Sequence, residues 1–142
     1  KQQYILVDGY NMIFAWQELR PLAEHDLDAA RRRLQDLLSS YAAFKKHTVV
    51  LVFDGDRRKG SPGEKTVEGP LHVVFTAEGE TADAYIEALA AEIGTNYTVR
   101  VATSDGLVQL SSLRSGVLRV SARELREEIL RAEEEMKLHY SK

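Results

Sequence analysis

Short apolar runs, each followed by acidic residues, constrain the fold of this chain more than any other feature. The runs cover residues 5–7, 49–53, 73–75 and 99–102, and the acids that follow them are Asp8, Asp54, Glu80, Asp83 and Asp105. Continuous apolar runs of this length are typical of strands that are buried on both faces, as they are in parallel sheets. The chain is therefore expected to build an open α/β sheet.

The segments between the runs have helical periodicity, which supports this fold class. Apolar residues recur every three or four positions over residues 27–46, where Asp26 is a plausible N-cap, and again over residues 81–93. We predict strands at 4–7, 48–53, 72–76, 97–102 and 117–120, and helices at 11–16, 27–46, 81–93, 107–113 and 122–140. Alternating strands and helices predict a three-layer α/β/α sandwich with a mostly parallel central sheet, formed by one domain over residues 1–142.

Composition narrows the class of protein. The 142 residues are 44% hydrophobic and 29% charged, as in an ordinary globular domain. The chain has no cysteine, which excludes disulfides and thiolate chemistry and fits a cytoplasmic location. No apolar run is long enough to span a membrane, and no secretory signal is apparent. The sequence begins with Lys1 and not Met, so we expect that a few residues precede it.

The acids are expected to converge, because the carboxyl ends of parallel strands meet at one edge of a sheet. Clustered carboxylates repel one another unless a cation neutralises them. Mg²⁺ and Mn²⁺ prefer oxygen ligands. The sequence therefore predicts an acidic metal site, of the kind that cleaves phosphodiester bonds.

Each acidic motif also has a purely structural interpretation. Asp8 and Asn11 would satisfy backbone donors in a strand-to-helix turn. Thr81 is a good N-cap, and Asp83 would then lie in the first turn of a helix, where the helix dipole favours acids. Asp105 could cap the helix expected after it. The repetition of acids at the same level of the sheet, with Glu80 beside Asp83, is what favours a functional site.

Basic and aromatic side chains near the acids suggest a nucleic-acid ligand. Residues 55–70 contain glycines, two prolines and mixed charges without periodicity, and are expected to form a loop. Its basic residues suited to holding phosphates are Arg57, Arg58, Lys59 and Lys65. Tyr10, Phe14 and Trp16 could stack on bases, although aromatic residues this close to a first strand more often pack in the core. The net charge of −3 argues against a general nucleic-acid coat but not against a nuclease.

These residues together resemble a known family. The segments at 7–11 (Val-Asp-Gly-Tyr-Asn), 52–55, 80–83 and 103–105 are similar to the NYN domains of the YacP-like family, relatives of PIN-domain ribonucleases. The resemblance implies a PIN-like fold and a metal-dependent endoribonuclease. It implies that Asp8, Asp83 and Asp105 form the acidic core, accompanied by Asn11, Asp54 and Glu80. Members of this family are associated with cleavage of mRNA on ribosomes.

The resulting hypothesis is hydrolysis of single-stranded RNA by a water that Mg²⁺ or Mn²⁺ activates. The expected substrate is mRNA, and the resemblance extends this expectation to mRNA on the ribosome. Asp8, Asp83 and Asp105 would bind the metal, helped by Glu80. Asn11, Thr103 and Ser104 would orient water or phosphate. The alternative is a non-catalytic RNA- or ribosome-binding module with the same fold. A phosphoacceptor receiver domain is disfavoured, because no lysine follows Ala102 before Lys137.

Overall fold

The centre of the molecule is a six-stranded sheet in the order β3-β4-β2-β1-β5-β6. The computed structural model describes residues 2–55, 60, 62–103 and 117–140. The strands are β1 (Gln3–Asp8), β2 (Thr48–Phe53), β3 (Glu64–Glu68), β4 (Leu71–Phe75), β5 (Thr98–Ala102) and β6 (Val117–Val120). All neighbouring strands run parallel except β3, which pairs antiparallel with β4. The predicted α/β fold with a mostly parallel sheet is confirmed.

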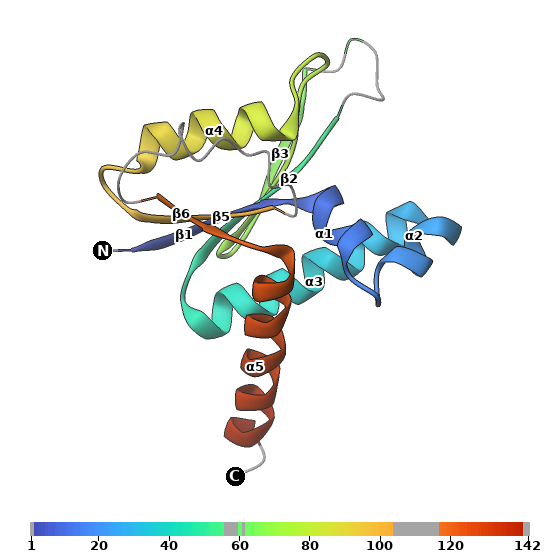
Figure 1. Ribbon diagram of the computed structural model, residues 1–142, viewed down its shortest axis with the longest axis vertical. Helices are drawn as coiled ribbons and strands as arrows, with labels where there is room; N and C mark the ends of the chain where they lie inside the picture. The colour runs from blue at the N-terminus through green and yellow to red at the C-terminus, as the bar shows by residue number, and fades with distance from the viewer. Residues whose placement is uncertain (1, 56–59, 61, 104–116, 141–142) are drawn as a thin grey trace.

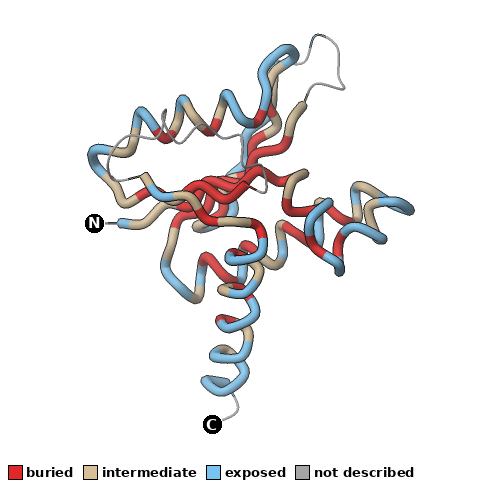
Figure 2. Tube along the Cα trace, viewed as in Figure 1, coloured by how far each residue is buried: buried red, intermediate tan, exposed pale blue. Residues whose placement is uncertain are grey.

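Helices cover both faces of the sheet (Figure 1). They are α1 (Gly9–Ala15), α2 (Arg20–His25), α3 (Leu27–Lys45), α4 (Ala82–Ile93) and α5 (Ala122–Tyr140). Helix α4 packs on one face with Leu6, Val52 and Val101. The other helices lie on the opposite face, where α3 and α5 pack over Ile5 and Leu51. Every residue of β2 is buried, and Figure 2 shows that the buried residues concentrate in the sheet.

Polar caps fix where the long helices begin. The Asp26 side chain accepts a hydrogen bond from the Ala29 amide at 3.1 Å and begins α3. Thr81 does the same for the Ala84 amide and begins α4. Before α5, the Ser121 hydroxyl accepts from the Glu124 amide while the Glu124 carboxylate accepts from the Ser121 amide, each at 3.0 Å. This reciprocal pair is a capping box.

The structure differs from the sequence predictions in two places. Part of the loop expected at 55–70 forms strand β3, whose residues are all exposed. Val67 is the only apolar residue among the five, so the segment has no alternating apolar pattern, and the strand exists because it pairs with the edge of β4. Helix α2 begins at Arg20, between the helices predicted at 11–16 and 27–46, and Pro21 lies in its first turn. Proline is tolerated there because those backbone N–H groups lack helical partners. The helix predicted at 107–113 lies outside the described residues.

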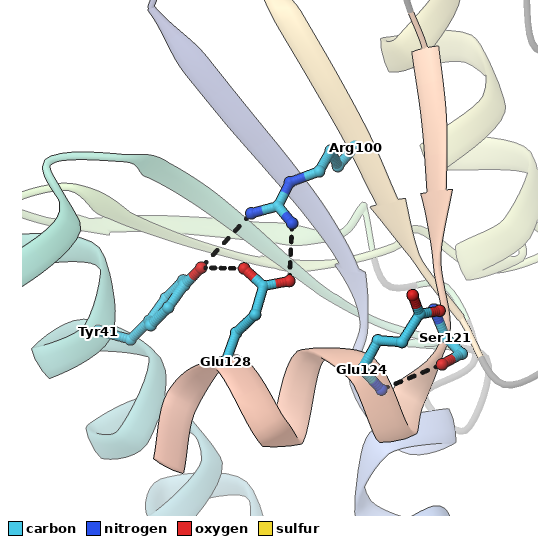
Figure 3. A network of polar contacts seen from close by, with 5 residues as sticks. All are labelled: Tyr41, Arg100, Ser121, Glu124 and Glu128. Atoms are coloured by element: carbon cyan, nitrogen blue, oxygen red, sulfur yellow. Dashed lines mark hydrogen bonds and ion pairs between the residues drawn. The ribbon is translucent and has the colours of Figure 1, made fainter. Parts of the chain in front are cut away.

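A polar network joins α3, β5 and α5 (Figure 3). Arg100 Nη1 donates to Glu128 Oε2 at 2.8 Å, and the Tyr41 hydroxyl donates to Glu128 Oε1 at 3.0 Å. Burial, and then the charge and hydrogen bond of Glu128, raise the pKa of Tyr41 to about 12. Burial disfavours ionisation of Glu128, but the hydrogen bonds and charge of its partners outweigh it and hold its pKa below 4.5. The network attaches α5 to the sheet.

No helix in the described part of the chain is long and apolar enough to cross a membrane.

Candidate active site

The carboxyl ends of the parallel strands meet at one edge of the sheet. Asp8 ends β1, Asp54 follows β2, Thr76 follows β4 and Thr103 follows β5. The register aligns these ends, because Asp8 is opposite Val52 of β2 and Val7 is opposite Ala102 of β5. Helix α4 begins near the same edge and contributes Asp83 in its first turn. The acids therefore come from separate parts of the chain to one place.

Asp8 is the buried acid of this edge. Only 6% of the residue is exposed, and its side chain caps α1 by accepting the Asn11 amide at 3.4 Å. The pKa of Asp8 is raised to about 6, chiefly because burial disfavours the charged form. The hydrogen bond from the Asn11 backbone opposes this, whereas the Asp83 carboxylate, by its charge and a hydrogen bond, and the Asp54 charge raise it further. Asp83 and Asp54 therefore lie near enough to Asp8 for their charges to act on its carboxyl group.

Glycines allow the strand ends to approach this closely. A Cβ atom on Gly9 would lie 2.4 Å from the Phe53 ring, and one on Gly55 would lie 2.0 Å from the backbone oxygen of Thr76. The Gly55 amide instead donates to the Thr76 hydroxyl at 2.9 Å, and that hydroxyl donates to the Glu80 carbonyl at 2.7 Å. Thr76 thus connects the end of β2 to the approach to α4. Thr76 is not among the site residues predicted from the sequence. Its only signal in the sequence is a hydroxyl side chain directly after the apolar run 73–75.

Asn11 is held by the end of β5. The Thr103 hydroxyl donates to Asn11 Oδ1 at 3.1 Å, and Thr103 itself is buried. The role expected for Thr103, to orient water or phosphate, stays a prediction, and in this structure its hydroxyl donates to Asn11. This hydrogen bond connects β5 to the first turn of α1 and orients the Asn11 amide beside Asp8.

The other predicted site residues divide into two groups. Glu80, three residues before Asp83 in sequence, is exposed and lines a groove together with Lys65 and Tyr85. Lys65 lies on the exposed edge strand β3. Asp105 and Ser104, together with the basic residues Arg57, Arg58 and Lys59, lie outside the described residues.

Proteins of known structure share this fold. A mutant of the T5 5′-exonuclease superposes with a TM-score of 0.51 at 21% identity, over 85% of this chain and 50% of that chain. This likeness and the topology define the fold as PIN-like. The chain belongs to the YacP-like NYN domain family, whose model matches residues 5–142.

Two relatives come from Bacillus subtilis. The protein YacP of strain 168, described as uncharacterized, is 40% identical over 126 residues, which are 88% of this chain and 74% of YacP. The crystal structure of Rae1 (YacP) superposes with a TM-score of 0.81 at 37% identity, over 97% of this chain and 79% of that chain. A mutant form of Rae1 gives a TM-score of 0.77 at 35% identity, over 94% and 78% of the two chains. The family is one of NYN/PIN-like nucleases.

Nucleases of the PIN-like class typically depend on metal ions, and the acids of this edge have suitable chemistry. Asp8, Asp54 and Asp83 supply only carboxylate oxygens, which are the ligands that Mg²⁺ and Mn²⁺ prefer. Burial is the main cause of the raised pKa of Asp8, and the Asp83 and Asp54 carboxylates raise it further. Among the described residues, no three His, Cys, Asp or Glu side chains are close enough together to form a complete metal cluster. The described acids therefore fit part of a cation site.

Proposed function

We propose that this chain is a metal-dependent endoribonuclease that cleaves single-stranded RNA, and that its substrate in the cytoplasm is mRNA engaged with the ribosome. The observation that carries the proposal is the buried Asp8 carboxyl, whose pKa is raised by burial and by Asp83 and Asp54, in a chain of the NYN/PIN-like nuclease family. The resemblance to factors that cleave mRNA on ribosomes supports the choice of substrate. One domain over residues 1–142 would carry the activity.

The proposed roles follow from the chemistry of each side chain. Asp8 and Asp83, with Asp105, would hold Mg²⁺ or Mn²⁺. When bound, such an ion lowers the pKa of water and stabilises charge on a phosphate. Asn11, which Thr103 orients, would hold water or a phosphate oxygen by its amide. Asp54 adds negative charge beside Asp8, and Glu80 lies before α4 near Asp83.

The basic residues would bind the substrate backbone. Lys65 is exposed on β3 and lines the same groove as Glu80, and its ammonium group is proposed to bind a phosphate of RNA that enters this groove. Arg57, Arg58 and Lys59 precede β3 in sequence and are proposed to bind flanking phosphates. Contacts of this kind position RNA without reading its sequence.

A circular single-stranded RNA tests this function, because only an endonuclease can linearise it. We expect linear product with Mn²⁺ or Mg²⁺ and none with EDTA. Asp8→Asn should lose about 1,000-fold in rate, because several kcal/mol of transition-state stabilisation depend on the metal. Asp36→Asn, an exposed acid of α3, is the matched control and should cleave normally. A circular DNA of the same sequence tests the preference for RNA.

The same variants should be assayed on mRNA bound to translating ribosomes, because the ribosome would present the substrate. If Asp8→Asn cleaves either RNA at the wild-type rate, the assignment of the acids is wrong. If the wild-type chain binds RNA but cleaves neither substrate with any metal, the protein is a non-catalytic RNA-binding module.

A further inference from the structure

An exposed aromatic side chain lies on the helix that begins at the acidic edge. Phe14 is 49% exposed, whereas Met12 and Ile13 of the same helix are fully buried. Helix α1 begins directly after Asp8, so a rise of about 1.5 Å per residue puts Phe14 roughly 9 Å along the helix from it. A nucleotide neighbouring a phosphate at Asp8 can span that distance. The exposed ring therefore lies less than two turns from the acidic end of the helix.

The three aromatic residues of this region have different environments. Trp16 is only 2% exposed, and its indole N–H donates to the Ala122 carbonyl at 2.9 Å, so it is a core residue. Tyr10 packs its ring on Phe53 with centroids 5.0 Å apart, and it is partly buried. Phe14 contacts the Tyr10 ring at a centroid distance of 6.4 Å. Packing in the core accounts for Trp16 and for one face of Tyr10, but it leaves about half of Phe14 exposed to solvent.

The Tyr10 ring, which Phe14 contacts, is held in place by its neighbours. Phe53 stacks on Phe75 at 5.2 Å, and Tyr10 rests on Phe53. Arg31 Nη1 of α3 donates to the Tyr10 hydroxyl at 2.9 Å. These contacts fix Tyr10 before any ligand arrives, so a base that stacks beside it loses little free energy to ordering of the protein.

Arg31 places a guanidinium group beside the Tyr10 ring. Its guanidinium donates to the Tyr10 hydroxyl and forms an ion pair with Asp28, and two of its five N–H donors account for these two hydrogen bonds. An aromatic face beside a cation is the usual arrangement by which proteins bind single-stranded nucleic acid. A duplex cannot use such a surface, because its bases are stacked on each other.

We infer that Phe14, supported by Tyr10 and flanked by Arg31, stacks on an unpaired base of the RNA bound at Asp8. This inference rests on the proposed nuclease function and identifies its substrate as RNA with unpaired bases. Phe14 and Tyr10 are binding residues in this arrangement, and Arg31 positions Tyr10. Because every base has a π-face, the contact favours single strands without selecting a sequence.

Binding and cleavage together test the inference. Affinity is measured by fluorescence anisotropy in EDTA with a labelled ten-nucleotide single-stranded RNA and with an abasic ribose-phosphate chain of equal length. Phe14→Ala should weaken RNA binding about tenfold or more and leave the weaker binding of the abasic chain unchanged. Phe14→Tyr should restore RNA affinity. Leu130→Ala, which removes a 43% exposed apolar side chain on α5, is the matched control and should bind as wild type.

Two further measurements separate stacking from a general loss of structure. Phe14→Trp should show more quenching of its indole emission by the RNA than wild type, whose emission comes from Trp16 alone, and no such difference with the abasic chain. In cleavage assays Phe14→Ala should raise KM with little change in kcat. Thermal unfolding checks that each variant is folded.

The outcomes distinguish the two proposals. If Phe14→Ala binds RNA as tightly as wild type, or loses equal affinity for the abasic chain, the stacking inference is wrong while cleavage by the wild type still supports the nuclease. If the wild-type chain neither binds nor cleaves RNA, both proposals fail.

Discussion

Asp8 has two roles that place opposite demands on its carboxyl group. As the N-cap of α1 it needs only an oxygen that accepts the Asn11 amide, and an amide side chain provides that equally well. As a buried acid next to Asp83 and Asp54 it carries a charge that the fold disfavours. Stability is therefore sacrificed at this residue, as is common where a charged group serves a ligand.

We predict that Asp8→Asn stabilises the metal-free protein. The folded-state pKa of about 6 lies above the ordinary 3.8, so the proton stabilises the fold at low pH and this stability is lost as the pH rises through about 6. Above pH 7 the variant should gain about 1–3 kcal/mol in unfolding free energy, and at pH 4 the difference should shrink strongly. Urea denaturation in EDTA at both pH values measures it. Equal stability of variant and wild type at pH 7.5 would contradict the prediction. Asp36→Asn, which changes an exposed acid, is the control and should be as stable as wild type at both pH values.

At the scale of elements, the Tyr41–Arg100–Glu128 network determines how α5 is attached. Three secondary structure elements contribute one side chain each, and both charged groups are largely buried. Removing one member of such a network leaves the other members desolvated without their partner, which costs more than the intact interaction contributes.

We predict that Glu128→Gln destabilises the protein by about 1–3 kcal/mol at pH 7. Because the pKa of Glu128 lies below 4.5 in the fold, its contribution is present above pH 4.5 and is lost as the pH falls through the folded-state value. The difference between variant and wild type should therefore narrow in acid. Glu127→Gln breaks only the exposed pair with Arg123 and should change stability by less than about 0.5 kcal/mol. Denaturant titrations from pH 3 to 7 compare the two.

Local sequence patterns were sufficient to predict most helices and strands, but not to predict which distant residues pair with them. Asp26 and Thr81 were recognised as caps because capping depends on a few adjacent residues. Strand β3 was missed because only its pairing with β4 makes it a strand. Arg100 in the apolar run 99–102 was a hint of a buried ion pair, yet nothing local could identify Glu128, 28 residues away, as its partner.

The candidate site shows the same division. Acids at strand ends could be recognised in sequence, because the topology of a parallel sheet brings those ends together. The direction of each side chain could not: Thr103 faces Asn11, and of three neighbouring aromatic residues only Phe14 is exposed. Helix periodicity over the seven residues of α1 is too short to distinguish its buried face from its exposed face.

At the scale of the whole molecule, the acids are assembled only by the complete fold, since Asp8, Asp54 and Asp83 belong to different parts of the chain. A ligand that binds them together must therefore stabilise the folded state as a whole. We predict that Mn²⁺ at 100 times its Kd raises the unfolding free energy by about 2.7 kcal/mol and Tm by roughly 10 °C. Calorimetry with and without EDTA measures this.

Asp8→Asn should abolish most of that metal-dependent shift, while Asp36→Asn should keep it. An equal shift in wild type and Asp8→Asn would place the bound ion elsewhere and contradict the prediction.

The single tryptophan of the chain occupies an informative position. Its indole is buried where α1 ends and is hydrogen-bonded to the carbonyl of Ala122, 106 residues later, where α5 begins. The wavelength of its emission therefore depends on whether these two ends of the chain remain in contact. The protein contains its own optical reporter for the junction between its first and last helices, and no label is needed to follow it.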